Sequence, residues 1–323
     1  MTAIKVKNLV KTYTTYKRGS GFKETVKSFF RREKVNINAV DGISFEIEKG
    51  TICGILGPNG AGKSTAIKML CGALYPTSGN IDVMGYSPAR DRVKYVGRIG
   101  AVFGQKSQLI WDIPPVDSFA MNKAIYGISD EDYNKRLSEM SELFDVEEVI
   151  HKPTRVLSLG ERMKCEFIMA MLHQPEIVFL DEPTIGLDVI AKNKIREVIG
   201  EMNRKGTTFI LTTHDLEDVE QLADNVIIIN HGKKVFDDTL SSLKNALGSK
   251  KIITLSLSKP YSGDNIGGAR IIDRDGFDVS IEVDTEKQEI TDFLKALTDY
   301  VDFKDISVKE LPMDMIITRI YSE

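Results

Sequence analysis

The residues best suited to chemistry form one run: Gly57-Pro58-Asn59-Gly60-Ala61-Gly62-Lys63-Ser64-Thr65. The run satisfies the pattern G-x-x-x-x-G-K-[ST] and stands between a strand-like stretch, 51–56, and a helix-like stretch, 66–70. Its glycines would let successive backbone N–H groups face the phosphates of a nucleotide, and the helix would add partial positive charge. Lys63 can reach the β- and γ-phosphates, and the Ser64 hydroxyl can bind Mg²⁺. We expect a nucleotide site here; the alternative is a glycine-rich turn that binds nothing.

Two carboxylates follow an apolar run at 177–180, as at the end of a parallel strand buried on both faces. Asp181 is placed to hold Mg²⁺ through water, and Glu182 can accept a proton from an attacking water. General-base help of this kind is worth about 10²–10⁴ in rate. A further strand-like run ends at His214, which a γ-phosphate could contact. The alternatives are carboxylates that cap a loop and a loop histidine with no task.

Three weaker signals accompany these. Gln105 follows a candidate strand at 98–103, where its amide oxygen could reach the same Mg²⁺. Ser158 and Glu161 form an S-x-x-E capping box at the start of a helix running to about residue 172, although that helix start could also bind an anion through Ser158 and the N–H of Gly160. Tyr13 or Tyr16 could stack on an adenine, and packing at a strand end is the other interpretation.

The remaining pattern suggests a core, an inserted helical subdomain and a separate C-terminal piece. Residues 4–10 alternate as an edge strand would, and 43–47 reads as a second strand. Helical spacing dominates 113–151, and 225–236 reads as a hairpin. After about residue 241 the chain predicts a small ferredoxin-like α+β sandwich, with strands at 251–257, 277–283 and 303–308 and helices at 287–300 and 313–321.

The segment 17–34 is basic inside an acidic protein, with seven lysines and arginines against two glutamates. Phe22, Val26, Phe29 and Phe30, at i, i+4, i+7 and i+8, would give a short helix one apolar face. Such a helix could lie among lipid headgroups or dock on a membrane partner. A solvated helix that packs on its own domain is the third interpretation.

Composition sets limits on the class of protein. With 323 residues, 42% hydrophobic and 28% charged, the chain suits one nucleotide-binding domain and a smaller unit. A net charge of −4 argues against a protein that coats nucleic acid. Cys53, Cys71 and Cys165 lack metal-ligand spacing and read as small buried hydrophobes in a reducing compartment. No secretory signal and no run of about 18–20 apolar residues is evident, so a membrane role would need a partner or a surface helix.

Together these motifs, in this order over roughly residues 4–240, resemble the ATP-binding subunit of an ABC transporter. The resemblance implies a P-loop ABC ATPase domain at 1–240, with a helical subdomain at about 106–160, and a regulatory or dimerisation domain at 241–323. It implies ATP and Mg²⁺ as cofactors, with Ser64, Gln105 and Asp181 at the metal and Glu182 and His214 in catalysis. It also selects Tyr13 over Tyr16 as the adenine-stacking aromatic.

The same resemblance implies a head-to-tail dimer that sandwiches two nucleotides. In it, the signature 157–161 contacts ATP on the other copy through Ser158, Gly160 and Glu161, and Asp188 belongs to the D-loop. Membrane permease subunits would be the partners, at the cytoplasmic face of the cell membrane, and no nucleic acid is expected. The usual LSGGQ reads LSLGE here, so the fine geometry of that contact is in question.

Within the family, the stretch 103–112 and the LSLGE signature resemble a bacterial export-type subfamily, and 17–34 resembles an insertion in exporters of lipid-linked polysaccharides. We therefore expect a subunit that powers export. The alternatives are a soluble ABC-type ATPase acting on nucleic acid or the ribosome, and an importer subunit.

Overall fold

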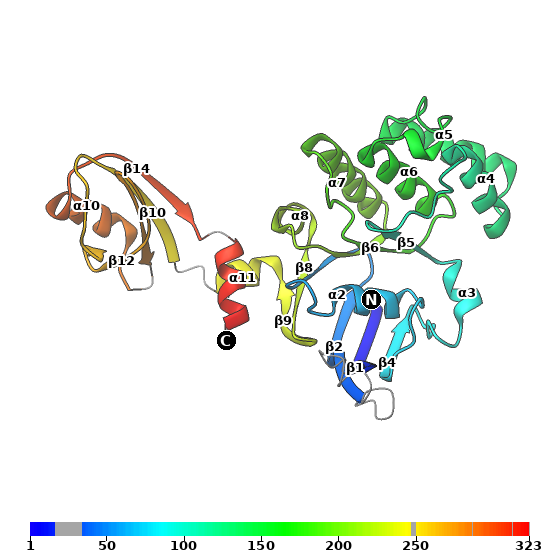
Figure 1. Cartoon of the computed structure of the whole chain (residues 1–323), viewed down its shortest axis with the longest axis horizontal. Helices are drawn as coiled ribbons and strands as arrows, with labels where there is room; N and C mark the ends of the chain where they lie inside the picture. The colour runs from blue at the N-terminus through cyan, green and yellow to red at the C-terminus, as the bar shows by residue number, and fades with distance from the viewer. Residues whose placement is uncertain (17–33, 247–249, 286, 312, 323) are drawn as a thin grey trace, which may run out of the picture. The chain divides into compact units, whose positions relative to one another are not determined.

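The computed structural model describes residues 1–16, 34–246, 250–285, 287–311 and 313–322. The basic segment expected to form an amphipathic helix lies, except for Lys34, outside the described residues. The chain divides into two compact units, Met1–Asp238 (unit 1) and Thr239–Glu323 (unit 2) (Figure 1). In the described part of the chain, no helix is both long and apolar enough to cross a bilayer.

A three-stranded antiparallel sheet begins unit 1. Its order is β2-β1-β4, so the strand at the N-terminus is central, and the expectation of an edge strand was wrong. The alternation seen in the sequence has another cause: Ile4 and Val6 are buried on one face, while Lys5 and Lys7 face outward. An antiparallel sheet can leave one face in water, so a central strand alternates as an edge strand does. The strands are β1 (Thr2–Tyr16), β2 (Lys34–Glu48) and β4 (Ser78–Val83).

A six-stranded sheet forms the centre of unit 1, in the order β5-β6-β7-β3-β8-β9. The first five strands are parallel, which brings their carboxyl ends to one edge. The turn into β9 uses His231 and Gly232, whose positive φ values of 47° and 78° suit a two-residue hairpin. The strands are β3 (Ile52–Leu56), β5 (Ile99–Phe103), β6 (Ile177–Asp181), β7 (Thr208–Thr212), β8 (Asn225–Asn230) and β9 (Lys233–Thr239).

The main core lies between these two sheets and the helix α2 (Lys63–Leu70). Ile4 and Phe45 from the small sheet, Ile55 and Phe179 from the large sheet, and Ile67 from α2 belong to one buried cluster. All three cysteines are free and buried, as the sequence suggested. Further helices of this part are α3 (Arg92–Val96), α7 (Val189–Arg204) and α8 (Leu216–Leu222).

Two helices lie within the stretch expected as a helical insertion, α4 (Pro115–Tyr126) and α5 (Asp130–Phe144), and α6 (Leu159–Met171) begins at its end. In Figure 1 they gather at one end of unit 1, away from β1, β2 and β4. Both α4 and α5 contact α6, whose buried face includes Phe167. The α6 helix also contacts β5, so the insertion is joined to the large sheet through the same helix that begins at the signature.

Unit 2 holds an antiparallel five-stranded sheet in the order β11-β12-β13-β10-β14. Its last four strands have the order and directions of a ferredoxin-like sheet. Only the second crossover carries a helix, because residues 258–264 between β10 and β11 form none. The elements are α9 (Leu240–Ala246), β10 (Lys250–Leu257), β11 (Asn265–Ile266), β12 (Ala269–Asp275), β13 (Asp278–Asp284), α10 (Ile290–Tyr300), β14 (Phe303–Glu310) and α11 (Met313–Ser322).

Candidate nucleotide site

The loop from β3 into α2 is shaped by a glycine. Gly62 stands directly before α2 with φ of 109°, a left-handed conformation that side chains rarely adopt. A Cβ at this position would lie 2.2 Å from the carbonyl oxygen of Ala39 in β2. The loop therefore passes close to the neighbouring strand only because residue 62 has no side chain.

The Lys63 ammonium is folded into this loop. It donates to the carbonyl oxygens of Gly57 at 2.7 Å and Pro58 at 3.2 Å, and the residue is 5% exposed. Burial lowers the pKa of Lys63, and the carboxylates of Glu182 and Asp181 oppose that shift. The carbonyl oxygens of the loop and the two carboxylates thus favour the charged form of the buried Lys63 ammonium.

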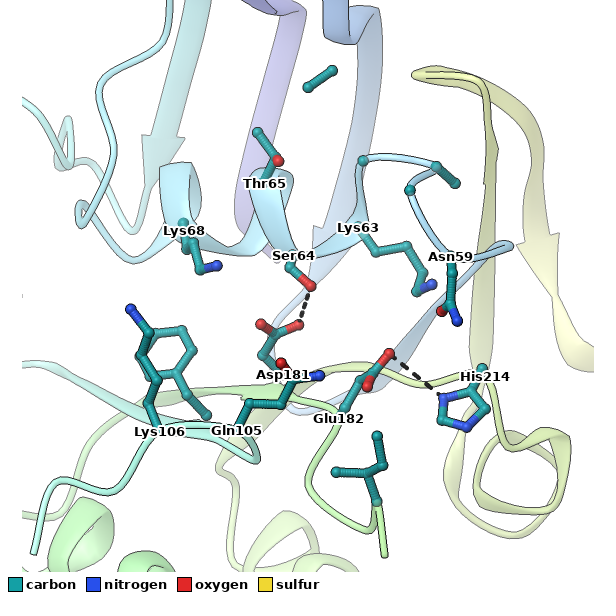
Figure 2. Close-up of a pocket in the computed structure, with 16 residues that line it drawn as sticks. Asn59, Lys63, Ser64, Thr65, Lys68, Gln105, Lys106, Asp181, Glu182 and His214 are labelled. Carbon is teal, nitrogen blue, oxygen red and sulfur yellow. Dashed lines mark hydrogen bonds and ion pairs between the residues drawn. The ribbon is translucent and has the colours of Figure 1, made fainter. Parts of the chain in front are cut away.

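Ser64 and Asp181 meet across 117 residues of sequence. The Ser64 hydroxyl donates to Asp181 Oδ1 at 2.7 Å (Figure 2). The Thr212 hydroxyl donates to the same oxygen at 2.6 Å. The parallel register places Asp181 opposite Phe103 on one side and Thr212 on the other, at the carboxyl edge of the sheet. This edge faces the first turn of α2.

Glu182 and His214 lie side by side next to this pair. His214 Nδ1 is 3.5 Å from Glu182 Oε1, with side chains 52% and 12% exposed, respectively. The Glu182 N–H donates to the Thr212 carbonyl at 2.9 Å, and Glu182 has a positive φ of 53°. A left-handed backbone is unusual outside glycine, and such positions gather at functional sites. The bend turns Glu182 out of β6 and toward the P-loop.

A cavity of about 430 Å³ joins these groups. It brings together most of the residues expected at the nucleotide, and Figure 2 shows Lys63 and Ser64 on one side with Gln105, Asp181, Glu182 and His214 on the other. The sequence analysis did not predict Lys68 and Lys106. Lys68 could have been predicted, because it follows Ser64 by four residues and therefore lies on the same face of the helix. The lining is Ala39, Asn59, Gly60, Ala61, Gly62, Lys63, Ser64, Thr65, Lys68, Phe103, Gln105, Lys106, Asp181, Glu182, Ile185 and His214.

Tyr13 does not line this cavity. It lies in β1 opposite Ile37 of β2, is 43% exposed, and has the Lys11 ammonium 5.5 Å from its ring centroid. An exposed ring beside a cation is free to take a planar ligand on its open face. Tyr16, the other aromatic considered, lies at the end of the same strand and is 45% exposed.

The signature residues Ser158, Gly160 and Glu161 and the D-loop residue Asp188 also stand outside the cavity. Ser158 accepts from the Glu161 N–H at 3.2 Å while Glu161 accepts from the Ser158 N–H at 2.8 Å, so the expected capping box is present. Gly160 follows on the first turn of α6, and a Cβ there would lie 3.0 Å from that of Ala191. Asp188 caps α7 by accepting from the Ala191 N–H at 2.8 Å. Ser158 and Asp188 are exposed at the starts of α6 and α7, and Gly160 and Glu161 are half-buried.

Comparison with known proteins now gives the family. A family model described as "ABC transporter" matches residues 40–185. The chain is similar to the ABC transporter ATP-binding protein NatA of Bacillus subtilis (strain 168), 32% identical over 234 residues that cover 72% of this chain and 95% of that protein. This chain belongs to the ABC transporter ATP-binding proteins. As a member of the family it is an ATPase that binds ATP.

Two further matches agree. The linearmycin resistance ATP-binding protein LnrL of Bacillus subtilis (strain 168) is 34% identical over 235 residues, covering 73% of this chain and 74% of that protein. A dimeric structure of the ATP-binding cassette MJ0796 in a post-hydrolysis state, bound to ADP and Pi, superimposes with a TM-score of 0.61 at 25% identity, covering 73% of this chain and 98% of that one. The ABC ATPase fold expected from the motifs is confirmed.

A buried ion pair supports the catalytic edge of this ABC ATPase. Asp218 on α8 is 1% exposed and pairs with Arg196 of α7, which is 5% exposed, at 2.6 Å. The second Asp218 oxygen accepts from the hydroxyls of Thr184 at 2.5 Å and Thr213 at 3.2 Å. Thr184 lies two residues after Glu182, and Thr213 directly precedes His214, so one carboxylate ties both loops together. Sequence reasoning missed this group, because nothing local marks Asp218.

A second buried carboxylate supports the segment after Gln105. Glu166 of α6 is 2% exposed and accepts from the N–H of Gln108 at 2.9 Å and from the Ser107 hydroxyl. Burial raises the pKa of Glu166, while the hydrogen bonds from Ser107, Leu109 and Gln108 oppose the shift. The helix that begins at the signature is thereby bonded to the segment that begins at Gln105.

Proposed function

We propose that this chain powers export through separate membrane permease subunits, as a peripheral protein at the cytoplasmic face of the cell membrane. The observation that carries the ATPase chemistry is the meeting of Ser64, Asp181 and Glu182 at one cavity, with the Ser64–Asp181 hydrogen bond of 2.7 Å at its centre. Export is supported by the name of LnrL, a resistance protein, and the substrate would be bound by the permease.

The donor set around Ser64 fits Mg²⁺. A hydroxyl, the Asp181 carboxylate and the Gln105 amide lining the same cavity are hard oxygen donors, the kind that Mg²⁺ takes alongside waters and substrate phosphates. Bound there, the ion would neutralise charge that develops on the phosphates. Ser64 would then give up its hydrogen bond to Asp181 and ligate the ion, and Asp181 would hold the ion through water.

The chain's own residues divide the remaining tasks. Lys63 turns from the carbonyls of Gly57 and Pro58 to the phosphates, and its charge binds the β- and γ-phosphoryl oxygens. Glu182 accepts a proton from the attacking water, and His214, 3.5 Å away, holds the γ-phosphate side of the site. Tyr13 covers the adenine.

The site is proposed to be completed by a second copy. Ser158, Gly160 and Glu161 are exposed or half-exposed at a helix start that faces no nucleotide cavity of its own copy. A helix N-terminus attracts anions, so each signature would bind the γ-phosphate held by the other copy, with Asp188 beside it. Support comes from the dimeric cassette with ADP and Pi. ATP would close the pair, and hydrolysis would release it.

The test separates binding from hydrolysis. Lys63→Ala should lose ATP affinity, whereas Glu182→Gln should keep ATP, lose about 10²–10⁴ in turnover, and elute as a dimer only when ATP is present. Glu147→Gln, an exposed change of the same chemistry away from the cavity, serves as the control and should match the parent. Parental turnover by Glu182→Gln would refute the assignment of the base.

The partner is tested separately. Tagged chain recovered from membranes in mild detergent should bring polytopic membrane proteins with it, and removal of 17–34 should reduce that recovery if this segment docks at the membrane. Recovery of the chain with ribosomes or nucleic acid, and with no membrane protein, would refute the transporter role.

A further inference from the structure

Unit 2 ends its sheet in an open edge. β14 is the outermost strand of the order β11-β12-β13-β10-β14, and within the described residues no strand pairs with its outer side. Six of its eight residues are exposed, Val308 to 41%. We propose that β14 pairs with β14 of a second copy, antiparallel about a two-fold axis at Ser307. This is a second self-association surface, distinct from the proposed nucleotide sandwich.

The backbone of β14 has donors turned outward. The Ile306 N–H donates to the carboxylate of the adjacent Asp305 at 2.9 Å, which indicates that it points away from β10 and takes a local substitute for a strand partner. Because N–H and C=O groups alternate in direction along a regular strand, residues 306, 308 and 310, which follow the register shift at Lys304, present theirs to the open edge. Ser307 would then lie in a non-hydrogen-bonded pair, the closer of the two kinds of pair.

Symmetry restricts the register. Two identical strands can pair antiparallel in one continuous sheet only about an axis perpendicular to that sheet, so each residue meets one of the same parity and both copies keep α10 on the same side. Ile306 and Val308 are opposite Leu255 and Ile253 of β10, which belong to the core beneath α10. An axis at Ser307 sets Ile306 against Val308 of the second copy and covers apolar surface on that face.

The charges of β14 select this register. About Ser307, Asp305 meets Lys309 of the second copy, and the two-fold axis repeats this pair; Lys304 lies at the register shift of β14 against β10 and is left out of the pairing. If the axis lay one residue away, at Ile306 or Val308, no charged residue of β14 would lie opposite a charged residue of the other β14. Opposite charges directly across two strands stabilise the pairing, and like charges oppose it.

These charged groups are available. Lys309 is exposed and makes no ion pair with any residue that the structure describes. Asp305 is exposed, and its carboxylate accepts from the N–H of the adjacent Ile306 at 2.9 Å. Lysines on an edge strand often prevent pairing with other chains. In the proposed pair, by contrast, Lys309 of each copy lies opposite Asp305 of the other, so the two charges attract.

Cysteine cross-linking tests the register in the full chain without nucleotide. Ser307→Cys places two thiols opposite each other on the axis, at a separation that a disulfide can span. Lys309→Cys is the matched control: same strand, same face and exposed, but the two copies of residue 309 would be four residues apart, about 13 Å. The native cysteines are buried, 8% exposed at most.

We expect a disulfide-linked dimer from Ser307→Cys and none from Lys309→Cys under the same mild oxidation. No dimer from Ser307→Cys, or equal amounts from both, would overturn the proposal.

A charge exchange gives an independent measurement. In sedimentation without nucleotide, Lys309→Asp should weaken dimerisation by roughly fivefold or more, because two attractive pairs become repulsive. Adding Asp305→Lys should restore it, because the exchanged charges again oppose each other across the axis. A parent chain that remains monomeric at high concentration, or a double variant no better than the single one, would refute it.

Discussion

Replacing Asp218 with alanine should destabilise unit 1 more than any surface change. The substitution removes the partner of Arg196, which is 5% exposed, and the acceptor for the hydroxyls of Thr184 and Thr213. An arginine cannot lose its proton, so the cation would remain buried without its main counter-charge. The loops carrying Glu182 and His214 would lose the carboxylate that joins them.

The magnitude follows from burial. Removing one partner of a buried ion pair costs about 3–5 kcal/mol. Glu217, whose carboxylate lies 3.3 Å from Arg196 but is 59% exposed, compensates in part, so we expect the lower end, about 3 kcal/mol. At a urea m-value of about 3 kcal/mol/M, the unfolding midpoint would fall by about 1 M.

The assay is urea unfolding combined with steady-state ATP hydrolysis. Asp218→Asn keeps the shape and an acceptor oxygen and should cost less than Asp218→Ala. A cycle with Arg196→Met should be non-additive by about 0.5–3 kcal/mol, since the second change removes the stranded cation. Turnover should fall in Asp218→Asn while the KM for ATP stays near the parental value, because P-loop contacts are untouched. A midpoint for Asp218→Ala equal to that of the parent would refute the reasoning.

Three further predictions concern other supports. Gly62→Ala should abolish ATP binding, since its Cβ would lie 2.2 Å from the carbonyl oxygen of Ala39. Gly60 has a φ of 83° but open space around it, so Gly60→Ala should still fold and should bind ATP more weakly than the parent. The Ser158 N–H lowers the pKa of Glu161, so Glu161→Ala should cost about 0.3–1 kcal/mol above pH 4.5, and the difference should vanish as pH falls through that lowered pKa. Glu166→Gln should reduce turnover more than ATP affinity, measured by hydrolysis and nucleotide binding, because the segment after Gln105 loses the negative charge and one of the two acceptor oxygens that bind it; equal losses would contradict this.

Much of the fold could be predicted because its elements carry local patterns. The β6 run Ile177–Leu180 is continuously apolar, as a strand covered on both faces must be, and the Ser158–Glu161 capping box is formed by residues three apart. The central place of β1 could not be predicted, because alternation reports one solvated face and not the number of neighbouring strands. No helix was predicted between β10 and β11 and none is present in the described residues 258–264, but the strands β11 and β12 were not predicted, and their place in the sheet is a tertiary property.

The sequence alone determined which residues could handle phosphate. The P-loop is contiguous, and Asp181 and Glu182 follow a buried strand, so their chemistry is readable within a few residues. Tertiary structure decided which of them meet: parallel pairing of β6 with β7 sets Asp181 beside Thr212, and the first turn of α2 brings Ser64 within 2.7 Å of it. It also decided that Asp218 supports both catalytic loops, because this buried carboxylate has its partners Arg196, Thr184 and Thr213 in three separate segments that no local pattern links.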